Sequence, residues 1–265
     1  MMEYVNFGKA GVKVSRLAYG LGFRGQSDAD EAERVLEKGV ELGLTFFDCA
    51  NVYGFNDDGT QRGSSEQVLA RVLKRHRDDL FISSKVFSPI GDGPNDRGSS
   101  RYHIMREIDR SLSRLETDHL DVYILHSWDD TTPLDETLRA VDDLVQAGKT
   151  RYIGVSNFRA WQVLKALWTQ DQLDLDPLVC IQNPYSLLNR GIEAELLPLC
   201  RDENIAVVPY QILQGGLLSG KYGDPAAPPA GTRGSDKPEW IAMLRDEEAL
   251  RELDALGARA KEVGL

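Results

Sequence analysis

The sequence predicts an α/β fold, a (β/α)8 barrel of the TIM type preceded by an N-terminal hairpin. Its 265 residues fall within the range of a single barrel domain. Apolar runs alternate with amphipathic stretches along the chain, which indicates parallel strands joined by helical crossovers. The apolar runs are continuous, as is typical of strands buried on both faces. No break in composition marks a second domain, so we expect one domain over residues 1–265.

The expected elements follow one another in a regular order. Residues 4–14 predict a hairpin over the floor of the barrel, with Gly8 and Gly11 near its turn. Acidic residues open several later helices, and Gly43 and Gly148 end two of them, in line with capping and helix-dipole preferences. We expect strands at 16–22, 45–50, 80–86, 121–127, 151–157, 178–184 and 206–212, and helices at 28–43, 64–76, 100–116, 134–148, 159–170, 191–204 and 247–265.

Seven strands are expected where a closed barrel of this type has eight. An open barrel would leave the first and seventh strands with unpaired edges, which natural proteins cover or pair. We therefore expect the sequence to stop before the eighth strand and helix, so that the barrel domain is incomplete at its C-terminal end. The loops 88–100 and 222–240 are rich in glycine and proline and are expected on the mouth of the barrel, as plain surface loops or as lids.

The charge and composition argue against several classes of protein. A formal net charge of −11 would repel phosphates, so we expect neither a nucleic-acid nor an acidic-membrane partner. No apolar run approaches the ~20 residues of a membrane span, and the N-terminus lacks the apolar core of a secretory signal. The three cysteines follow no CxxC spacing, and Cys49 and Cys180 lie in apolar runs, so buried reduced thiols are expected. We expect a cytoplasmic protein, of open oligomeric state.

Four ionisable residues are expected to gather at one end of the barrel. Asp48, Tyr53, Lys85 and His126 lie at, or a few residues beyond, the C-terminal ends of three expected strands, which open on one mouth. An ammonium beside a phenol stabilises the phenolate, an aspartate keeps the lysine charged, and a histidine can hydrogen-bond a carbonyl oxygen. A lone lysine or aspartate there is usually structural, but the joint placement indicates proton transfer to a carbonyl.

Two competing interpretations are weaker. Gly20, Gly22 and Gly25 spell GxGxxG after the first strand, as in a Rossmann dinucleotide site, but the helix is expected to begin only after Ser27 and six further strand–helix units follow. A metal-dependent barrel hydrolase would need clustered histidines and carboxylates, and only one of the four histidines is expected at the mouth. We therefore expect no metal ion in the site.

Several segments resemble signatures of the aldo-keto reductase family. They are FFDCANVYG (46–54), SLSRLETDHLDVYILH (111–126), GKTRYIGVSNF (148–158) and GGLLSGKY (215–222). The likeness runs over nearly the whole chain, in several motifs in the right order. It implies NAD(P)H-dependent reduction of a small-molecule aldehyde or ketone, with Tyr53 as general acid, Lys85 and Asp48 tuning it, and His126 orienting the carbonyl.

The resemblance also implies a site for NADP. Ser156, Asn157 and Gln182 match positions that hydrogen-bond the nicotinamide carboxamide, and Tyr210 matches the aromatic residue that stacks on the ring. Ser156 and Asn157 can instead cap the following helix, and Gln182 can satisfy a buried backbone group. The other positions that match a cofactor contact are Phe23, Arg24, Asp48, Gln211, Leu213, Gln214, Gly215 and Lys221.

The chain departs from the family pattern in two places. Tyr210 to Leu213 read Tyr-Gln-Ile-Leu, where the family usually has Tyr-Ser-Pro-Leu, which puts the pyrophosphate contacts in doubt. The eighth strand and the residues after it that hold the adenosine phosphate have no counterpart, so NADPH is favoured over NADH by family habit alone. Two alternatives stay open: a nucleotide-sensing or regulatory subunit with little turnover, and an inactive fragment of a longer reductase.

Overall fold

The computed structural model describes the chain in two compact parts. The described residues are 1–265 without 23–27, 56–58, 223–226, 237–240, 242–246 and 265. Unit 1 consists of Met1–Asn183 and Gly191–Val208, and unit 2 consists of Pro184–Arg190 and Pro209–Leu265. Unit 1 contains the parallel sheet and the helices packed around it.

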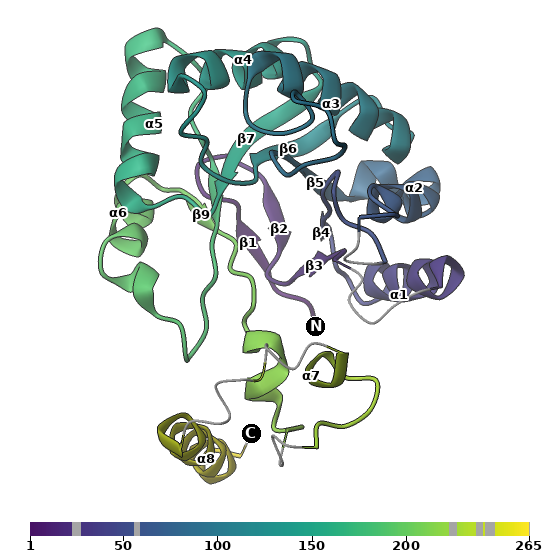
Figure 1. The fold of residues 1–265 in the computed structure, drawn as a ribbon, viewed down its shortest axis with the longest axis vertical. Coiled ribbons are helices and arrows are strands. Elements are labelled where there is room, and N and C mark those ends of the chain that lie inside the picture. Colours follow the sequence, from purple (N-terminus) through teal and green to yellow (C-terminus); the bar gives the residue numbers. More distant parts are fainter. Residues whose placement is uncertain (23–27, 56–58, 223–226, 237–240, 242–246, 265) are drawn as a thin grey trace. The chain divides into compact units, whose positions relative to one another are not determined.

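A curled parallel sheet of seven strands forms the centre of unit 1 (Figure 1). Each strand pairs in parallel with the next one along the chain, so the predicted α/β class and strand order are confirmed. The two six-residue strands, Phe81–Val86 and Leu120–Leu125, are buried over their whole length, which agrees with their largely apolar sequences. The strands are β3 (Ala18–Gly20), β4 (Phe46–Asp48), β5 (Phe81–Val86), β6 (Leu120–Leu125), β7 (Thr150–Ser156), β8 (Cys180–Gln182) and β9 (Ala206–Val207).

Amphipathic helices lie along the outer side of this sheet (Figure 1). Side-chain oxygens cap two of them: Asp28 accepts from the backbone N–H of Asp30, and Ser100 accepts from that of His103. Their apolar faces join the strands in one core cluster. The elements are α1 (Ala29–Glu41), α2 (Ser64–His76), α3 (Arg101–Leu115), α4 (Leu134–Gln146), α5 (Ala160–Leu173) and α6 (Leu196–Asp202), with short 3-10 turns η1 (Arg77–Asp79) and η2 (Gly191–Glu193).

The predicted N-terminal hairpin is confirmed as the antiparallel pair β1 (Tyr4–Asn6) and β2 (Lys13–Ser15). The ring of Phe7 in its turn lies 5.5 Å from the ring of Phe46 and 4.9 Å from that of Phe81, at the starts of β4 and β5. Gly8 adopts φ of +54°, and a Cβ there would lie 2.6 Å from the backbone nitrogen of Ala206. Glycine therefore lets the hairpin approach the N-terminal end of the sheet, the floor opposite the expected site.

Most of the expected elements are shorter in the structure, and proline accounts for two of the differences. The seventh strand was expected over 206–212, but β9 ends at Val207, and Pro209 cannot donate to a strand ladder. The helix expected over 191–204 is divided into η2 and a seven-residue α6. Pro198 explains the late start, because proline is tolerated in the first turn of a helix and breaks one further inside.

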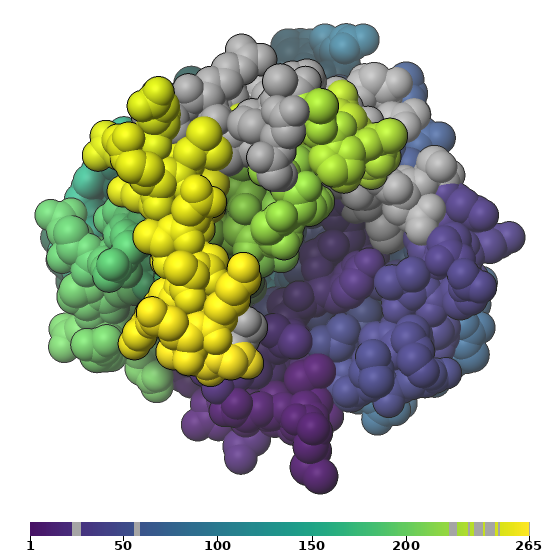
Figure 2. Space-filling model, turned by 90° about the horizontal axis from the view of Figure 1, so that it is seen from below, coloured from purple at the N-terminus to yellow at the C-terminus, as the bar shows by residue number. Residues whose placement is uncertain are grey.

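Unit 2 has its own small apolar core. Leu217, Tyr222 and Ile241 are buried, and Leu250 and Leu253 pack against them. The loop expected over 222–240 includes one short helix among its described residues. Most residues of the last helix, yellow in Figure 2, are exposed. The elements are η3 (Gln214–Ser219), α7 (Arg233–Asp236) and α8 (Glu247–Glu262). None of the helices in the described residues is both long enough and apolar enough to cross a membrane.

Candidate active site

Asp48 and Lys85 form a buried ion pair at the C-terminal ends of two adjacent strands. Asp48, the last residue of β4, is in register with Ser83 of β5, and Lys85 lies two residues further along, on the same face. Lys85 Nζ donates to Asp48 Oδ2 and to the carbonyl oxygen of Cys49, at 2.7 Å each. Ser83 Oγ donates to Asp48 Oδ1 at 2.6 Å. Both carboxylate oxygens therefore have hydrogen-bond donors.

The charge of Asp48 keeps Lys85 protonated despite its burial. Lys85 is completely buried, and removal from water alone would lower the pKa of its ammonium. The Coulombic effects of Asp48 and then of Tyr53, together with the hydrogen bond to Asp48, outweigh this effect, so the pKa of Lys85 is raised above its ordinary value. The site thus holds a fixed positive charge that does not titrate near neutral pH.

Tyr53 is held over this charge by the segment that follows β4. Lys85 Nζ lies 4.6 Å from the centre of the Tyr53 ring, and the Tyr53 hydroxyl lies 3.4 Å from His126 Nε2. Gly54 follows directly, and a Cβ there would lie 2.3 Å from the carbonyl oxygen of Gln61. Only glycine lets the chain fold back so closely after Tyr53, which keeps the tyrosine at the strand ends.

His126 follows β6 directly and has a neutral imidazole. Burial, reinforced by the positive charge of Lys85 and only partly opposed by Asp48, lowers the pKa of His126 to about 3. Its Nε2 faces the Tyr53 hydroxyl, while Nδ1 is buried with no hydrogen-bond partner among the described residues. A neutral imidazole can donate one hydrogen bond to a carbonyl oxygen without carrying a charge.

The four residues thus form one connected arrangement. Asp48 binds Lys85, Lys85 lies against the Tyr53 ring, and Tyr53 meets His126. A carbonyl oxygen placed between the Tyr53 hydroxyl and His126 Nε2 would have two donors, one of which can give up its proton beside a buried ammonium. This arrangement can protonate a carbonyl oxygen while the carbon gains electrons from another reactant.

The polar residues expected around the nicotinamide lie in the same unit, at the ends of β7 and β8. Ser156 Oγ donates to the carbonyl oxygen of Gln182 at 2.8 Å. Asn157 Nδ2 donates to the His126 carbonyl oxygen at 2.9 Å and to Ser156 Oγ at 3.0 Å. Asn157, with φ of +61°, therefore ties the end of β7 to the residue that carries the imidazole.

The capping alternative for Ser156 and Asn157 is wrong. Helix α5 begins at Ala160 with Arg159 as its N-cap residue, and Gln162 Oε1 accepts from the Arg159 backbone N–H at 2.8 Å. The side chains of Ser156 and Asn157 instead bond to the ends of neighbouring strands, the second through the His126 carbonyl oxygen.

The remaining expected cofactor residues lie in unit 2, apart from three. Asp48 is in unit 1, and Phe23 and Arg24 lie outside the described residues. Tyr210 forms a parallel bridge with Pro184, and its carbonyl oxygen accepts from the Tyr185 N–H at 3.2 Å.

A sharp turn follows Tyr210. Gln211, Gln214, Gly215 and Gly216 all have left-handed backbones, with φ of +56°, +48°, +67° and +100°. Gln214 Oε1 accepts from Ser186 Oγ at 2.9 Å, which fixes one side of the turn. Leu213 is exposed within it.

Lys221 lies beside this turn. Its Cε is so close to Gly216 that a Cβ on that glycine would lie 2.6 Å from it. The side chain is exposed, with Nζ 5.2 Å from the centre of the Tyr222 ring. The turn and the lysine together offer left-handed backbone and one exposed cation.

The sequence analysis missed two residues that build the site. Ser83 holds Asp48, and the two-residue period of a strand already places it on the same face as Lys85, so a period argument would have found it. Asn51 lies between Asp48 and Tyr53 and donates from Nδ2 to Glu107 Oε2 at 3.2 Å. That partner is 56 residues away, and no local pattern points to it.

Comparison with known proteins places the chain among reductases. The model of the Aldo/keto reductase family matches residues 16–262. An uncharacterized oxidoreductase of Bacillus subtilis, YrpG, is 37% identical over 99% of this chain and 80% of its own length. A probable voltage-gated potassium channel subunit beta of Arabidopsis thaliana is 34% identical, over 100% and 80% respectively. An L-glyceraldehyde 3-phosphate reductase of Escherichia coli is 33% identical over 83% of this chain and 64% of its own length.

Proposed function

Because this chain belongs to the aldo/keto reductase family, we propose that it reduces an aldehyde or a ketone to an alcohol with NADPH or NADH. The observation that carries the proposal is the position of the Tyr53 hydroxyl, 3.4 Å from a neutral imidazole and on a ring 4.6 Å from a buried ammonium. Members of the family generally use a nicotinamide cofactor, and family habit favours NADPH.

In this proposal Tyr53 gives its proton to the carbonyl oxygen as hydride reaches the carbonyl carbon. Lys85, kept charged by Asp48, stabilises the phenolate that remains. His126 is neutral, donates a hydrogen bond from Nε2 to the same oxygen, and so orients the carbonyl. Tyr53 must regain a proton from solvent before the next turnover.

Two groups of residues, one in each unit, have the chemistry that parts of a dinucleotide need. The Ser156 hydroxyl already donates its proton to Gln182, so it can offer a lone pair, which suits the NH2 of a carboxamide. In unit 2 the left-handed turn from Gln211 to Gly216, with Lys221 beside it, suits a pyrophosphate. The cofactor, when bound, would supply the hydride.

Three further expectations, on the fold, the substrate and the compartment, belong to the same proposal. The seven-stranded sheet would be part of a (β/α)8 barrel, with one reductase domain spanning residues 1–265. The substrate would be a small carbonyl compound. Cys49, Cys180 and Cys200 are free buried thiols, which supports a reducing compartment such as the cytoplasm.

The second candidate is a regulatory subunit that binds the nucleotide and turns over little. The named relative from Arabidopsis thaliana supports it, since that protein carries the name of a channel subunit. The complete set of Asp48, Tyr53, Lys85 and His126 favours the enzyme, because cofactor binding alone does not require a proton donor beside a carbonyl site.

Two measurements on the purified chain separate these candidates. A titration with NADPH that follows tryptophan fluorescence reports whether the cofactor binds. Steady-state oxidation of NADPH with a simple aromatic aldehyde then reports turnover. Saturable quenching with aldehyde-dependent oxidation supports the reductase, and saturable quenching without oxidation supports the regulatory subunit. The absence of both would contradict the two candidates together.

A further inference from the structure

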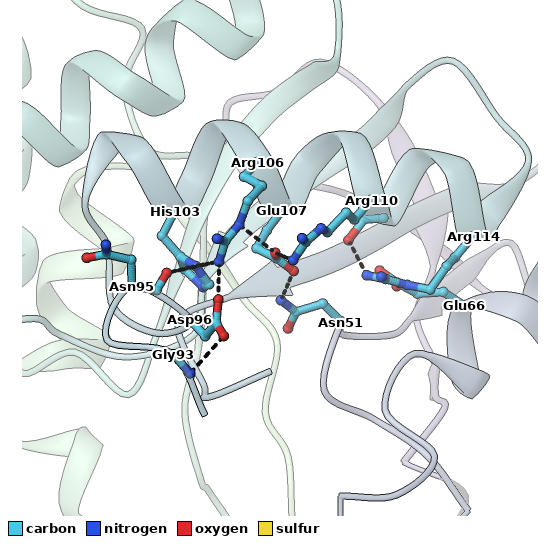
Figure 3. Close-up of polar contacts among 11 residues, drawn as sticks. Asn51, Glu66, Gly93, Asn95, Asp96, His103, Arg106, Glu107, Arg110 and Arg114 are labelled. Carbon is cyan, nitrogen blue, oxygen red and sulfur yellow. Dashed lines mark hydrogen bonds and ion pairs between the residues drawn. The ribbon is translucent and has the colours of Figure 1, made fainter. Parts of the chain in front are cut away.

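We propose that Glu107 on helix α3 is a positioning residue for Tyr53, acting through the side chain of Asn51. The inference rests on the proposed reductase function and adds a residue of the outer helix layer to its machinery. It starts from a hydrogen bond that joins the outer helix layer to the segment between Asp48 and Tyr53 (Figure 3).

Asn51 is the fixed point of that segment. It is 2% exposed, and its backbone N–H points to the Lys85 carbonyl oxygen at 3.4 Å. Its Nδ2 donates to Glu107 Oε2 at 3.2 Å. Asn51 is thus held from β5 on one side and from α3 on the other.

Movement of Asn51 is transmitted to Tyr53 because a single turn connects them. The Tyr53 N–H donates to the Ala50 carbonyl oxygen at 3.1 Å, which closes the turn around Asn51. On the helix α2 side, Ser65 Oγ donates to the same Ala50 oxygen at 3.2 Å, and Gly63 N–H donates to the Tyr53 carbonyl oxygen at 3.1 Å. The bond to Glu107 is the side-chain anchor of this turn on α3.

Burial of the Glu107 carboxylate costs free energy, which indicates that its hydrogen bonds contribute something that an apolar side chain could not. The side chain is completely buried in the layer between α3 and the strands. Arg110 Nη1 donates to Oε1 at 2.9 Å, and Arg106 Nε lies 3.6 Å from the same oxygen, so two partly exposed guanidinium groups neutralise it. An apolar side chain of similar length would fill this helix position without needing either arginine.

Figure 3 shows these arginines along α3, with the Glu107 carboxylate in contact with them and with the side chain of Asn51. Among the hydrogen bonds and ion pairs that Glu107 makes within the described residues, the bond to Asn51 is the one that leaves α3. The carboxylate therefore connects the Tyr53 segment to α3. A displacement of about 1 Å at a reacting group can cost 10²-fold in rate.

The test compares Glu107→Met with Glu107→Gln. Methionine fills the space but cannot accept a hydrogen bond, whereas glutamine keeps an oxygen for Asn51 Nδ2. We expect Glu107→Met to lower kcat by about 10- to 100-fold with little change in the Kd for NADPH, and Glu107→Gln to stay within about threefold of wild type. Asn51→Ala should match Glu107→Met, and the double variant should be no slower than the slower single variant.

Asp121→Asn is the matched control. Asp121 is also a buried carboxylate, accepting from the Ile82 N–H at 2.9 Å and from Arg77 and Arg151, but it lies at the start of β6, away from Tyr53. We expect this variant to lose thermal stability while kcat of the folded protein is unchanged. If Glu107→Met behaves like Asp121→Asn, the role of Glu107 is structural and the inference is overturned.

Hydrogen exchange keeps the inference testable if the wild-type chain shows no turnover, a result that would count against the reductase instead. We expect amides of residues 49–54 to exchange faster in Glu107→Met than in Glu107→Gln, with unchanged exchange in the middle of α3. Equal exchange of residues 49–54 in the two variants would contradict the positioning role, whatever the activity of the protein.

Discussion

The Tyr53 hydroxyl lies 3.4 Å from Nε2 of His126, although 73 positions separate the two residues in the sequence. The distance is long for a hydrogen bond between these groups, and the two rings meet edge to face. A substrate oxygen bound between them would take donors from both.

The buried ion pair predicts that Asp48→Asn alone lowers the free energy of unfolding more than Asp48→Asn combined with Lys85→Met. Without Asp48, the Lys85 ammonium would remain buried with no opposite charge, at a cost of about 3–5 kcal/mol in the free energy of unfolding. Lys85→Met added to Asp48→Asn should recover part of this loss, because no charge is then stranded. Urea unfolding of the three variants measures it, and additive losses would contradict the account.

The same variants separate stability from activity. The double variant has neither the ammonium nor its partner, so we expect it to fold better than Asp48→Asn and still fail to reduce aldehydes. Recovery of turnover together with stability would show that Lys85 has no part in the reaction.

The lowered pKa of His126 predicts a pH-dependent loss of stability. Between pH 6.5 and about pH 3 the unfolded chain protonates His126 and the folded chain does not, so the unfolded state binds more protons. The free energy of unfolding should therefore fall as pH falls through this window, by at most about 1.4 kcal/mol per pH unit from this group. Wild type should lose more stability than His126→Gln over the same range, and parallel stability curves would contradict the lowered pKa.

Activity should not follow that titration. His126 stays neutral from pH 5 to 8 in the folded protein, so its titration should contribute no inflection to kcat/KM near pH 6.5. The shape of the pH profile in this range should therefore be the same in wild type and in His126→Gln. The pH profiles of wild type and of this variant, both measured at saturating NADPH, test the point.

Lys221 predicts a salt-dependent contribution to cofactor binding. We expect Lys221→Met to raise the Kd for NADPH by about tenfold at low ionic strength, because a charge-assisted contact to phosphate is lost, and by less as salt screens it. Lys38→Met is the control, since Lys38 is exposed on α1 and pairs with Glu41 at 2.7 Å. Equal effects of the two variants would remove Lys221 from the cofactor site.

Alanine substitutions at Gly216 and at Gly220 test whether the shape of the turn matters for cofactor binding. Both have left-handed backbones, so alanine costs about 1 kcal/mol of strain at either position. A Cβ at Gly216 would also displace Lys221, whereas at Gly220 it meets open space. Fluorescence titration should therefore show weaker NADPH binding for Gly216→Ala than for Gly220→Ala. The reverse order would contradict a cofactor contact at this turn.

The strand ends were the most predictable part of the molecule. Continuous apolar runs place Asp48, Lys85 and His126 at or next to the last residues of parallel strands, and parallel strands bring such ends together by geometry alone. The amphipathic pattern also predicted the bounds of α2 correctly, at 64–76. The short β9 was less predictable, because the apolar residues 206–208 run directly into Pro209, and hydropathy does not record a missing N–H.

The supporting contacts could not be predicted in the same way. Asn51 and Glu107 meet because α3 packs against the segment after β4, and a helix periodicity assigns Glu107 only to a face. A buried carboxylate interrupts the apolar pattern of that face, and the pattern alone does not identify the residue to which it bonds. The lowered pKa of His126 likewise depends on its burial and then on Lys85, which is 41 residues earlier in the chain.

The most direct test of the central claim is kcat for aldehyde reduction in Tyr53→Phe, with Tyr152→Phe as its control. The Tyr152 hydroxyl donates to the Ala10 carbonyl oxygen at 2.7 Å on the floor of the sheet, so its removal should leave kcat unchanged. Loss of the proton donor in Tyr53→Phe should lower kcat by about 10²- to 10⁴-fold while NADPH still binds with its normal Kd. A Tyr53→Phe protein that turns over at the wild-type rate would show that the proton comes from elsewhere.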